Sequence, residues 1–308
     1  MKFQKLSSNI CLIGFLCVWC HVLKAQNIES PRFFHLNFQS FSPTERLVSK
    51  QGTVVSPNNE EPGFLLASKL LFPISLKGKT KLIGQLNYSR ESIHGLYDAE
   101  AGQDKFLHFS NLGVSLITQH KYNRRTTYLS VWKFQTGSEQ LFAFDRQSFS
   151  FNTTHLIQRT PNRRTKVGLG VQIAYNQRLS ILPVIKYEKE LGSNWKADIL
   201  LPSQALFFKK LDKNRQVYMG VKGARANYLL NQTQPFEGDV YYRRLNANVL
   251  IGFERQLKGL LGFRLETGVN VPLRSGLYTV DQRWERMHSY QEGVNPYVKA
   301  GIFLAIDK

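Results

Sequence analysis

One short segment of the chain combines residue types that can cleave esters, His108-Phe109-Ser110-Asn111. His108 and Ser110 are two positions apart, so in a β-strand both side chains point to the same face. A serine becomes a nucleophile when a neighbouring histidine takes its proton, a third group orients that histidine, and donors stabilise the oxyanion. The weak catalytic candidates are therefore His108, Ser110 and Asn111.

The same segment resembles the His-x-Ser-Asn segment that outer-membrane phospholipases carry on the outer wall of a barrel, where a second Asn orients the His. The resemblance covers only four residues. Leu112 stands where those enzymes have Gly, and no Tyr-Thr-Gln segment precedes it. Because a short match without its supporting residues is weak evidence, we predict that the chain is not an enzyme. A phospholipase-like esterase that uses His108 and Ser110 is the alternative.

No other spacing of residues indicates a cofactor or a metal ion. The histidines after residue 25 show neither His-x-His nor His-x₃-His spacing. Gly168-Leu169-Gly170 lacks the third glycine of a dinucleotide-binding loop. The cysteines are Cys11, Cys17 and Cys20, all near the N-terminus. We therefore predict no cofactor and no metal site.

The segment Leu245–Val271 indicates which element must position any functional side chain. Its odd positions are mostly apolar, such as Val249 and Leu265, whereas its even positions include Glu254 and Arg264. A period of two is typical of a β-strand with one apolar face. Fourteen such runs follow residue 25, at 32–41, 63–74, 80–91, 105–120, 126–135, 147–158, 165–177, 180–190, 195–201, 204–211, 215–228, 239–255, 260–272 and 295–306.

The connections between these runs alternate between two kinds. Tight turns are expected at 77–79, 123–125, 161–163, 192–194, 212–214 and 258–259, and the other side has long links at 42–62, 92–104, 136–146, 229–238 and 273–294, with short ones at 178–179 and 202–203. Short turns on one side, longer loops on the other and an apolar outward face are typical of a transmembrane barrel. We predict an all-β, antiparallel up-and-down transmembrane β-barrel of about 14 strands (about 12–14). A soluble sandwich or lipocalin-like barrel is the alternative.

The first 25 residues have the layout of a signal peptide. Lys2 and Lys5 precede the apolar stretch 10–23, and Ala25 offers a small residue for cleavage. We predict a signal peptide at 1–25, cleaved near Ala25, and an outer-membrane barrel domain at 26–308 of a Gram-negative bacterium. Cleavage lowers the formal net charge from +19 to +16, because three lysines and no acid are lost, and it removes all three cysteines. Despite this basic charge, an exported barrel is not expected to bind nucleic acid.

In such a barrel the polar positions line the interior. The candidate lumen residues are Lys69, Lys186, Glu188, Lys222, Arg244, Glu254, Arg264 and Glu266. A barrel of about eight strands is filled by side chains, whereas 16–18 strands leave an aqueous pore. The favoured function is thus a passive pore or a structural barrel. An adhesin that binds a partner through its outer loops, notably 42–62 and 273–294, is a further alternative.

Several segments resemble those of an uncharacterised family of Gram-negative outer-membrane β-barrel proteins that carries only a domain-of-unknown-function label. They are Ser42-Pro43-Thr44-Glu45, Leu76-Lys77-Gly78-Lys79-Thr80-Lys81-Leu82, Gly252-Phe253-Glu254-Arg255 and Pro296-Tyr297-Val298-Lys299-Ala300-Gly301-Ile302. The resemblance implies the fold and an outer-membrane location but no activity. It also implies contact with outer-membrane lipids and with the barrel-insertion machinery, with small solutes as further partners if the lumen is open. Asp307-Lys308 departs from the aromatic residue with which many such barrels end.

Overall fold

The computed structural model describes residues 32–41, 63–76, 78–98, 103–139, 148–176, 178–230, 240–257, 260–279, 286–290 and 294–305. The predicted signal peptide and its cleavage near Ala25 lie outside these ranges. Within them, no helix has the length and apolar character needed to span a membrane.

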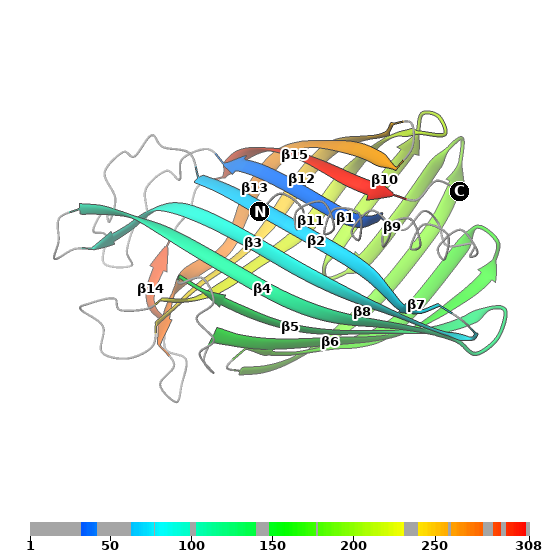
Figure 1. The fold of residues 1–308 in the computed structure, drawn as a ribbon, viewed down its shortest axis with the longest axis horizontal. Helices are drawn as coiled ribbons and strands as arrows, with labels where there is room; N and C mark the ends of the chain where they lie inside the picture. The colour runs from blue at the N-terminus through cyan, green and yellow to red at the C-terminus, as the bar shows by residue number, and fades with distance from the viewer. Residues whose placement is uncertain are drawn as a thin grey trace, which may run out of the picture.

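The described residues form one antiparallel sheet that closes on itself (Figure 1). Consecutive strands pair from β12 back to β1, β1 pairs with β15, and β15 pairs with β13. The ring is completed because β13 also pairs with β12 along Val240–Gln256. Every strand except the short β14 belongs to this ring, so the predicted 14-stranded up-and-down barrel is confirmed. Closure leaves no open sheet edge along most of the wall, as hydrocarbon surroundings require.

The strands agree closely with the fourteen predicted runs. Their bounds are β1 Arg32–Phe41, β2 Gly63–Ser75, β3 Thr80–Asp98, β4 Gln103–Lys121, β5 Thr126–Ser138, β6 Phe149–Asn162, β7 Thr165–Asn176, β8 Arg178–Gly192, β9 Trp195–Leu201, β10 Gln204–Lys210, β11 Arg215–Leu230, β12 Val240–Gln256, β13 Leu261–Thr279, β14 Arg286–Tyr290 and β15 Asn295–Ala305. Two expectations were wrong. The link 92–104 is much shorter than predicted, because β3 and β4 stay paired up to Asp98 and Gln103. The link 273–294 contains the end of β13 and the additional strand β14.

Hydrogen bonds from the backbone to side chains stabilise tight turns at one end of the barrel. Asn123 accepts hydrogen bonds from the backbone N–H groups of Arg125 and Thr126, both at 2.8 Å. Asp212 accepts bonds of the same length from Asn214 and Arg215. Such bonds let Asn and Asp replace backbone partners in a turn. We call this rim the turn end and the opposite rim the loop end.

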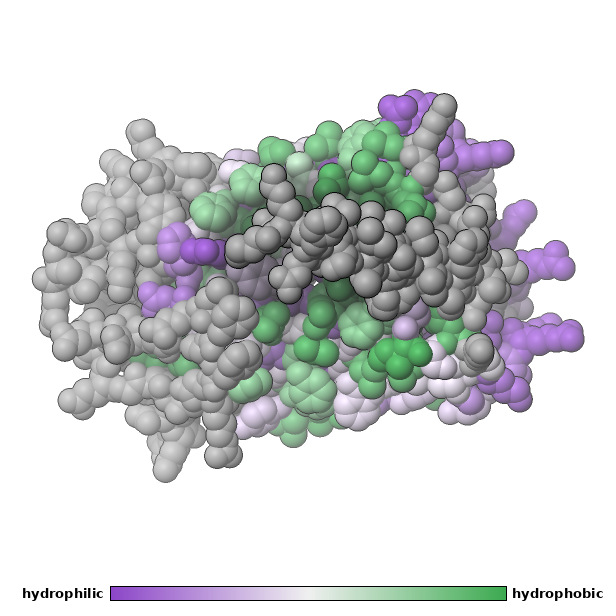
Figure 2. All heavy atoms as spheres, in the orientation of Figure 1, coloured by the Kyte–Doolittle hydropathy of each residue, from purple (hydrophilic) through white to green (hydrophobic). Residues whose placement is uncertain are grey.

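The outer surface carries the apolar face of the strands. Leu169, Ile181 and Ile251 are 70%, 61% and 52% exposed, respectively. In Figure 2 the hydrophobic residues cover the middle of the visible face, and hydrophilic side chains project at the turn end. An apolar band around a closed barrel is the surface that a lipid bilayer solvates, so the chain has the architecture of a membrane-spanning barrel.

The wall is not equally tall all the way around. Most strands have ten or more residues, but β9 and β10 have 7 each, fewer than the roughly 9–11 that span a bilayer. Above this low section, the ends of β5 and β11 approach directly. Leu229 pairs with Ser138 in a parallel bridge, and the Glu139 N–H donates to the Leu229 carbonyl at 3.3 Å. The barrel is therefore narrower at the loop end than its strand number suggests.

Candidate functional site in the barrel interior

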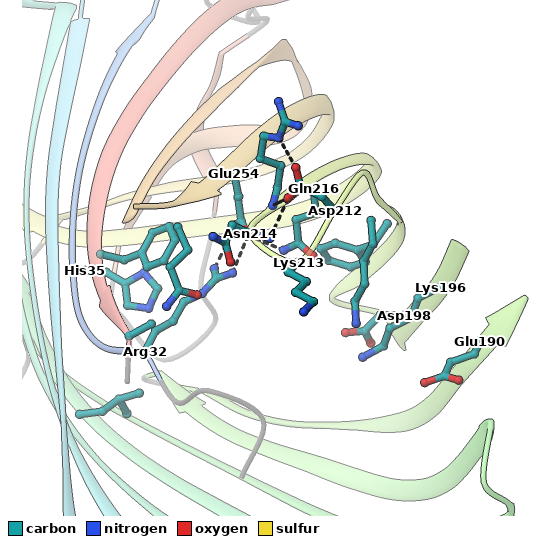
Figure 3. A pocket seen from close by; sticks show the side chains of 17 residues that line it. Arg32, His35, Glu190, Lys196, Asp198, Asp212, Lys213, Asn214, Gln216 and Glu254 are labelled. Carbon is teal, nitrogen blue, oxygen red and sulfur yellow. Dashed lines mark hydrogen bonds and ion pairs between the residues drawn. The ribbon is translucent and has the colours of Figure 1, made fainter. Parts of the chain in front are cut away.

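A cavity of about 590 Å³ occupies the interior near the turn end (Figure 3). Its lining comes from both sides of the barrel, including Arg32 of β1 and Glu254 of β12 as well as Lys196 and Asp198 of β9. Most of these side chains are charged or polar. The geometry suits water and small ionic solutes better than an apolar ligand.

One corner of this cavity is formed around the carboxylate of Glu254, which is only 2% exposed. Arg32 donates to it at 3.0 Å, Gln216 donates at 2.5 Å, and Arg264 forms an ion pair with it. Two guanidinium groups and an amide satisfy one buried anion, so the buried charge is compensated as burial requires.

A second buried carboxylate, Glu266, lies further inside the barrel. Lys222 donates to it at 2.9 Å, and the hydroxyls of Tyr218 and Tyr297 donate at 2.8 and 3.1 Å. Tyr218 and Tyr297 also pack with Leu206 and Leu250 in a small core cluster. This side of the interior is therefore filled by side chains, and any free passage lies beside it.

The opposite wall carries a third group of interior charges, on β7, β8 and β9. Lys166 and Lys196 approach Glu188 at 3.0 and 3.1 Å. Lys186 forms an ion pair with Asp198. These side chains come from adjacent strands, so they tie the wall together without crossing the lumen.

Near the loop end, by contrast, side chains from opposite walls meet. Glu91 of β3 pairs with Arg244 of β12, and the Tyr228 hydroxyl of β11 donates to Glu91 at 2.7 Å. Phe109 of β4 stacks on Tyr228 with ring centroids 4.3 Å apart and an interplanar angle of 12°, and on Tyr242 at 5.8 Å. We call these residues the loop-end bridge. At this level β3 is separated from β12 by β13, β15, β1 and β2 on one side and, across the β5–β11 bridge, by β4, β5 and β11 on the other, so the Glu91–Arg244 contact spans the interior and narrows it.

Three interior lysines differ from all these groups because they form no ion pair among the described residues. Lys69, Lys133 and Lys299 point inward from β2, β5 and β15, and no ion pair joins them to an acid within the described part of the chain. Lys299 lies near Glu266, whose oxygens are occupied by Lys222 and the two tyrosines. Lys69 and Lys133 lie within electrostatic range of each other. The interior thus carries surplus positive charge.

The lumen residues proposed from the sequence all lie on the interior face. The structure brings Glu254 together with Arg264, Lys222 with Glu266, and Lys186 near Glu188. It leaves Arg244 apart from these pairs, against Glu91. Sequence reasoning missed Arg32, Glu91 and Lys133. The alternation of polar and apolar residues placed all three on the polar face. No local pattern shows that Glu91 and Arg244, 153 positions apart, would meet.

The His and Ser of the candidate catalytic segment share one face of β4, as their spacing predicted. His108 and Ser110 lie on the outward face of β4, and Asn111 lies on the inward face. The His108 Nδ1 is 2.6 Å from the Ser92 hydroxyl on β3, a contact that sequence reasoning missed. Ser92 is fully buried, so this serine is not accessible to a substrate ester. The geometry gives the esterase alternative no support.

Other predicted sites are only partly within the described chain. No group of three or more metal-ligating side chains comes together among the residues described. The loop 42–62 of the adhesin alternative lies outside them, and of the loop 273–294 they include the end of β13, β14 and Val294.

The chain matches no protein-family model and no curated protein sequence, so the resemblance to a family with an unknown-function label stays a prediction. An outer-membrane channel from Pseudomonas putida F1 shares 9% identity over 91% of this chain and 97% of its own, with a TM-score of 0.47. A FadL homologue from Pseudomonas aeruginosa shares 10% identity over 91% of both chains, with a TM-score of 0.47. A TodX monoaromatic hydrocarbon channel mutant shares 9% identity over 91% of both chains, with a TM-score of 0.46. The similarity to these structures extends over most of the chain, but nothing about the solutes of this chain follows from it.

Proposed function

We propose that this chain is a narrow passive channel of a Gram-negative outer membrane that favours small anionic solutes. The closed barrel and its apolar outer band support the membrane location, together with the signal-peptide pattern of the sequence. Its partners on this proposal are the outer-membrane lipids, the barrel-insertion machinery and the solutes that pass through the lumen.

The observation that carries the proposal is the surplus of cations in the interior. Lys69, Lys133 and Lys299 face the lumen from β2, β5 and β15, and among the described residues none of them forms an ion pair with an acid. A charged lining with low-dielectric walls concentrates ions of the opposite sign. Rings of Lys and Arg are the usual lining of pores that select anions.

The hydrogen bonding of the interior also supports a wet passage. Asn246, Asn248 and Asn270 lie on the inward face of β12 and β13, between the Glu266 group and the loop-end bridge. Their side-chain oxygens are buried and have no hydrogen-bond partner within the described protein. Buried polar atoms are generally satisfied by protein or by water, so this layer favours a hydrated interior.

The decisive test is the reversal potential of the refolded chain in a planar bilayer with a KCl gradient. We expect small conductance steps and a reversal potential displaced toward the equilibrium potential of chloride. The triple variant Lys69→Gln/Lys133→Gln/Lys299→Gln should keep conductance steps and lose most of that displacement. Lys189→Gln, which removes an exposed cation at the turn end, is the matched control and should behave like the wild type. Absence of steps, or a preference for potassium, would contradict the proposal.

A further inference from the structure

The low section of the wall leaves a gap near the loop end, which we call the notch. It lies between the outward face of β11–β13 and the inward face of the end of β8. β8 pairs with β9 only from Ile185 onward, and β11 pairs with β10 only up to Lys222. Above these positions, β8 continues to Arg178 on one side of the notch and β11 continues to Leu230 on the other. The Asn227 side-chain amide of β11 donates to Asn176, the last residue of β7, at 3.0 Å, so a side-chain hydrogen bond links the two sides there. A cavity of about 340 Å³ lies in this notch.

Four arginines line the cavity, and they come from four different strands. They are Arg178 of β8, Arg225 of β11, Arg243 of β12 and Arg274 of β13. Arg225 and Arg274 both pair in register with Leu245, which is 38% exposed on the outward face. Because the same face of β12 two residues earlier carries Arg243, the three arginines form one outward patch. We call the four residues the arginine notch.

The described lining of this cavity contains no Asp or Glu. The other lining residues are Asn176, Leu179, Ser180 and Ile181. Arg243 lies within electrostatic range of the other three arginines. Four like charges held this close repel one another, so the site is complementary to an anion.

A tyrosine orients two of the guanidinium groups. The Arg274 Nε donates to the Tyr278 hydroxyl at 2.9 Å, and the Arg243 and Arg274 guanidinium carbons lie 5.9 and 5.6 Å from the Tyr278 ring centroid. Tyr278 is 1% exposed, so its position is fixed by packing. Arginines held in place before binding lose less side-chain entropy when a ligand arrives.

The position of the notch next to the apolar band indicates that the bound anion belongs to a lipid. Toward the turn end, the outward face of β11 continues through Val221 and Met219, which are 41% and 43% exposed. On β8 the notch continues into Leu179 and Ile181, which are 59% and 61% exposed and also line the cavity. Arg225, Arg243 and Arg274 are thus the first charges above the acyl-chain surface of β11–β13, where lipid headgroups lie. Arg178 reaches the same cavity from the inward face of β8.

We propose that the arginine notch binds the phosphate group of a membrane lipid, with an acyl chain of the same lipid lying against Leu179 and Ile181. The planar guanidinium fork matches the geometry of phosphate oxygens and forms paired, charge-assisted hydrogen bonds with them. The adjoining apolar side chains distinguish a lipid phosphate from a free one. This site lies in the gap of the wall, beside the outward face of β11–β13, and its test does not depend on conduction through the lumen.

The test is native mass spectrometry of the detergent-refolded full chain with lipid A that carries two phosphates. The triple variant Arg178→Gln/Arg225→Gln/Arg274→Gln should bind this lipid roughly tenfold to a hundredfold more weakly than the wild type, because it loses several charge-assisted hydrogen bonds. Dephosphorylated lipid A should bind the wild type as weakly as the variant binds the intact lipid. Arg255→Gln, which removes an exposed arginine near the turn end, should leave binding unchanged, and unaltered electrophoretic heat-modifiability would show that each variant is folded.

A second arm distinguishes a lipid phosphate from a free one. Inorganic phosphate and pyrophosphate at millimolar concentration should compete only weakly with the lipid. Full competition at concentrations equal to that of the lipid would show a soluble-anion site and overturn the lipid assignment. Equal lipid binding by the wild type and the triple variant would overturn the site itself.

Discussion

Each end of the interior has a buried glutamate paired with arginine, but the two pairs join different parts of the barrel. At the turn end, Glu254 binds Arg32, Arg264 and Gln216, which lie on its own part of the wall and beside an open cavity. At the loop end, Glu91 binds Arg244 and Tyr228 from the far side of the barrel. Both carboxylates are 2% exposed.

The difference shows that the effect of a buried ion pair on a barrel depends on which strands it joins. Pairs between neighbouring strands stabilise a wall that backbone hydrogen bonds already hold. A pair between opposite walls narrows the passage as well. The following predictions test this distinction, from the largest expected effect to the smallest.

Replacing Glu254 by alanine should cost the most stability and leave conductance nearly unchanged. It leaves Arg32 and Arg264 close together without their shared carboxylate, which lowers the free energy of unfolding by roughly 3–5 kcal/mol. Urea unfolding of the detergent-refolded chain, followed by tryptophan fluorescence, measures this loss. Glu190→Ala is the matched control because Glu190 lines the same cavity but is exposed. Equal losses in the two variants would show that the Glu254 pairs do not stabilise the wall.

Replacing Phe109 by alanine should open the loop-end bridge. The ring is completely buried within the loop-end bridge, where it stacks on Tyr228, so its loss should cost roughly 3 kcal/mol. The conductance of single-channel steps in a planar bilayer should also increase, by roughly twofold or more, because the loop-end bridge loses an aromatic ring. Phe253→Ala, on the outward face of β12, is the control and should not change the step size. Unchanged steps in Phe109→Ala would mean that the passage is limited elsewhere.

The substitution Glu91→Gln should have a smaller effect on stability than either change above, roughly 2 kcal/mol, because the amide keeps its size and can still accept a bond from Tyr228. The effect of Glu91→Gln on conduction should be larger than that of Glu254→Gln. Of these two carboxylates, Glu91 is the one that joins opposite walls. The comparison of open-channel lifetimes between these two variants measures this difference. Similar lifetimes would remove the distinction between the two ends.

The smallest effect is expected at the turn-end rim, from Asp212→Asn. The backbone N–H of Asn214, followed by the Arg215 side chain, holds the pKa of the Asp212 carboxyl below its usual range. A lowered folded-state pKa stabilises the fold above the unfolded pKa of about 3.9, and this contribution is lost as pH falls through the folded pKa. The urea midpoint of the wild type should therefore exceed that of the variant slightly at neutral pH and match it in acid. A difference that persists in strong acid would assign the effect to another cause.

The alternation of apolar and polar residues was sufficient to predict the strands, because a membrane strand must present opposite faces to lipid and lumen. It also placed residues such as Glu254 and Glu266 on the inward face. It failed at β14 and at the long β3–β4 hairpin, where pairing continues into segments that lack alternation. The partner of His108 was missed because Ser92 reaches it through the register of β3 and β4, not through spacing within one strand.

The sequence by itself determined a closed antiparallel barrel with a charged interior, since period-two patterning acts locally and hydrocarbon excludes open sheet edges. Only the tertiary structure decided which charges meet. Glu91 and Arg244 are 153 positions apart in the chain, and the four arginines of the notch come from four strands. Their proximity depends on strand lengths and on the closure of the ring, which bring together residues that no local pattern connects.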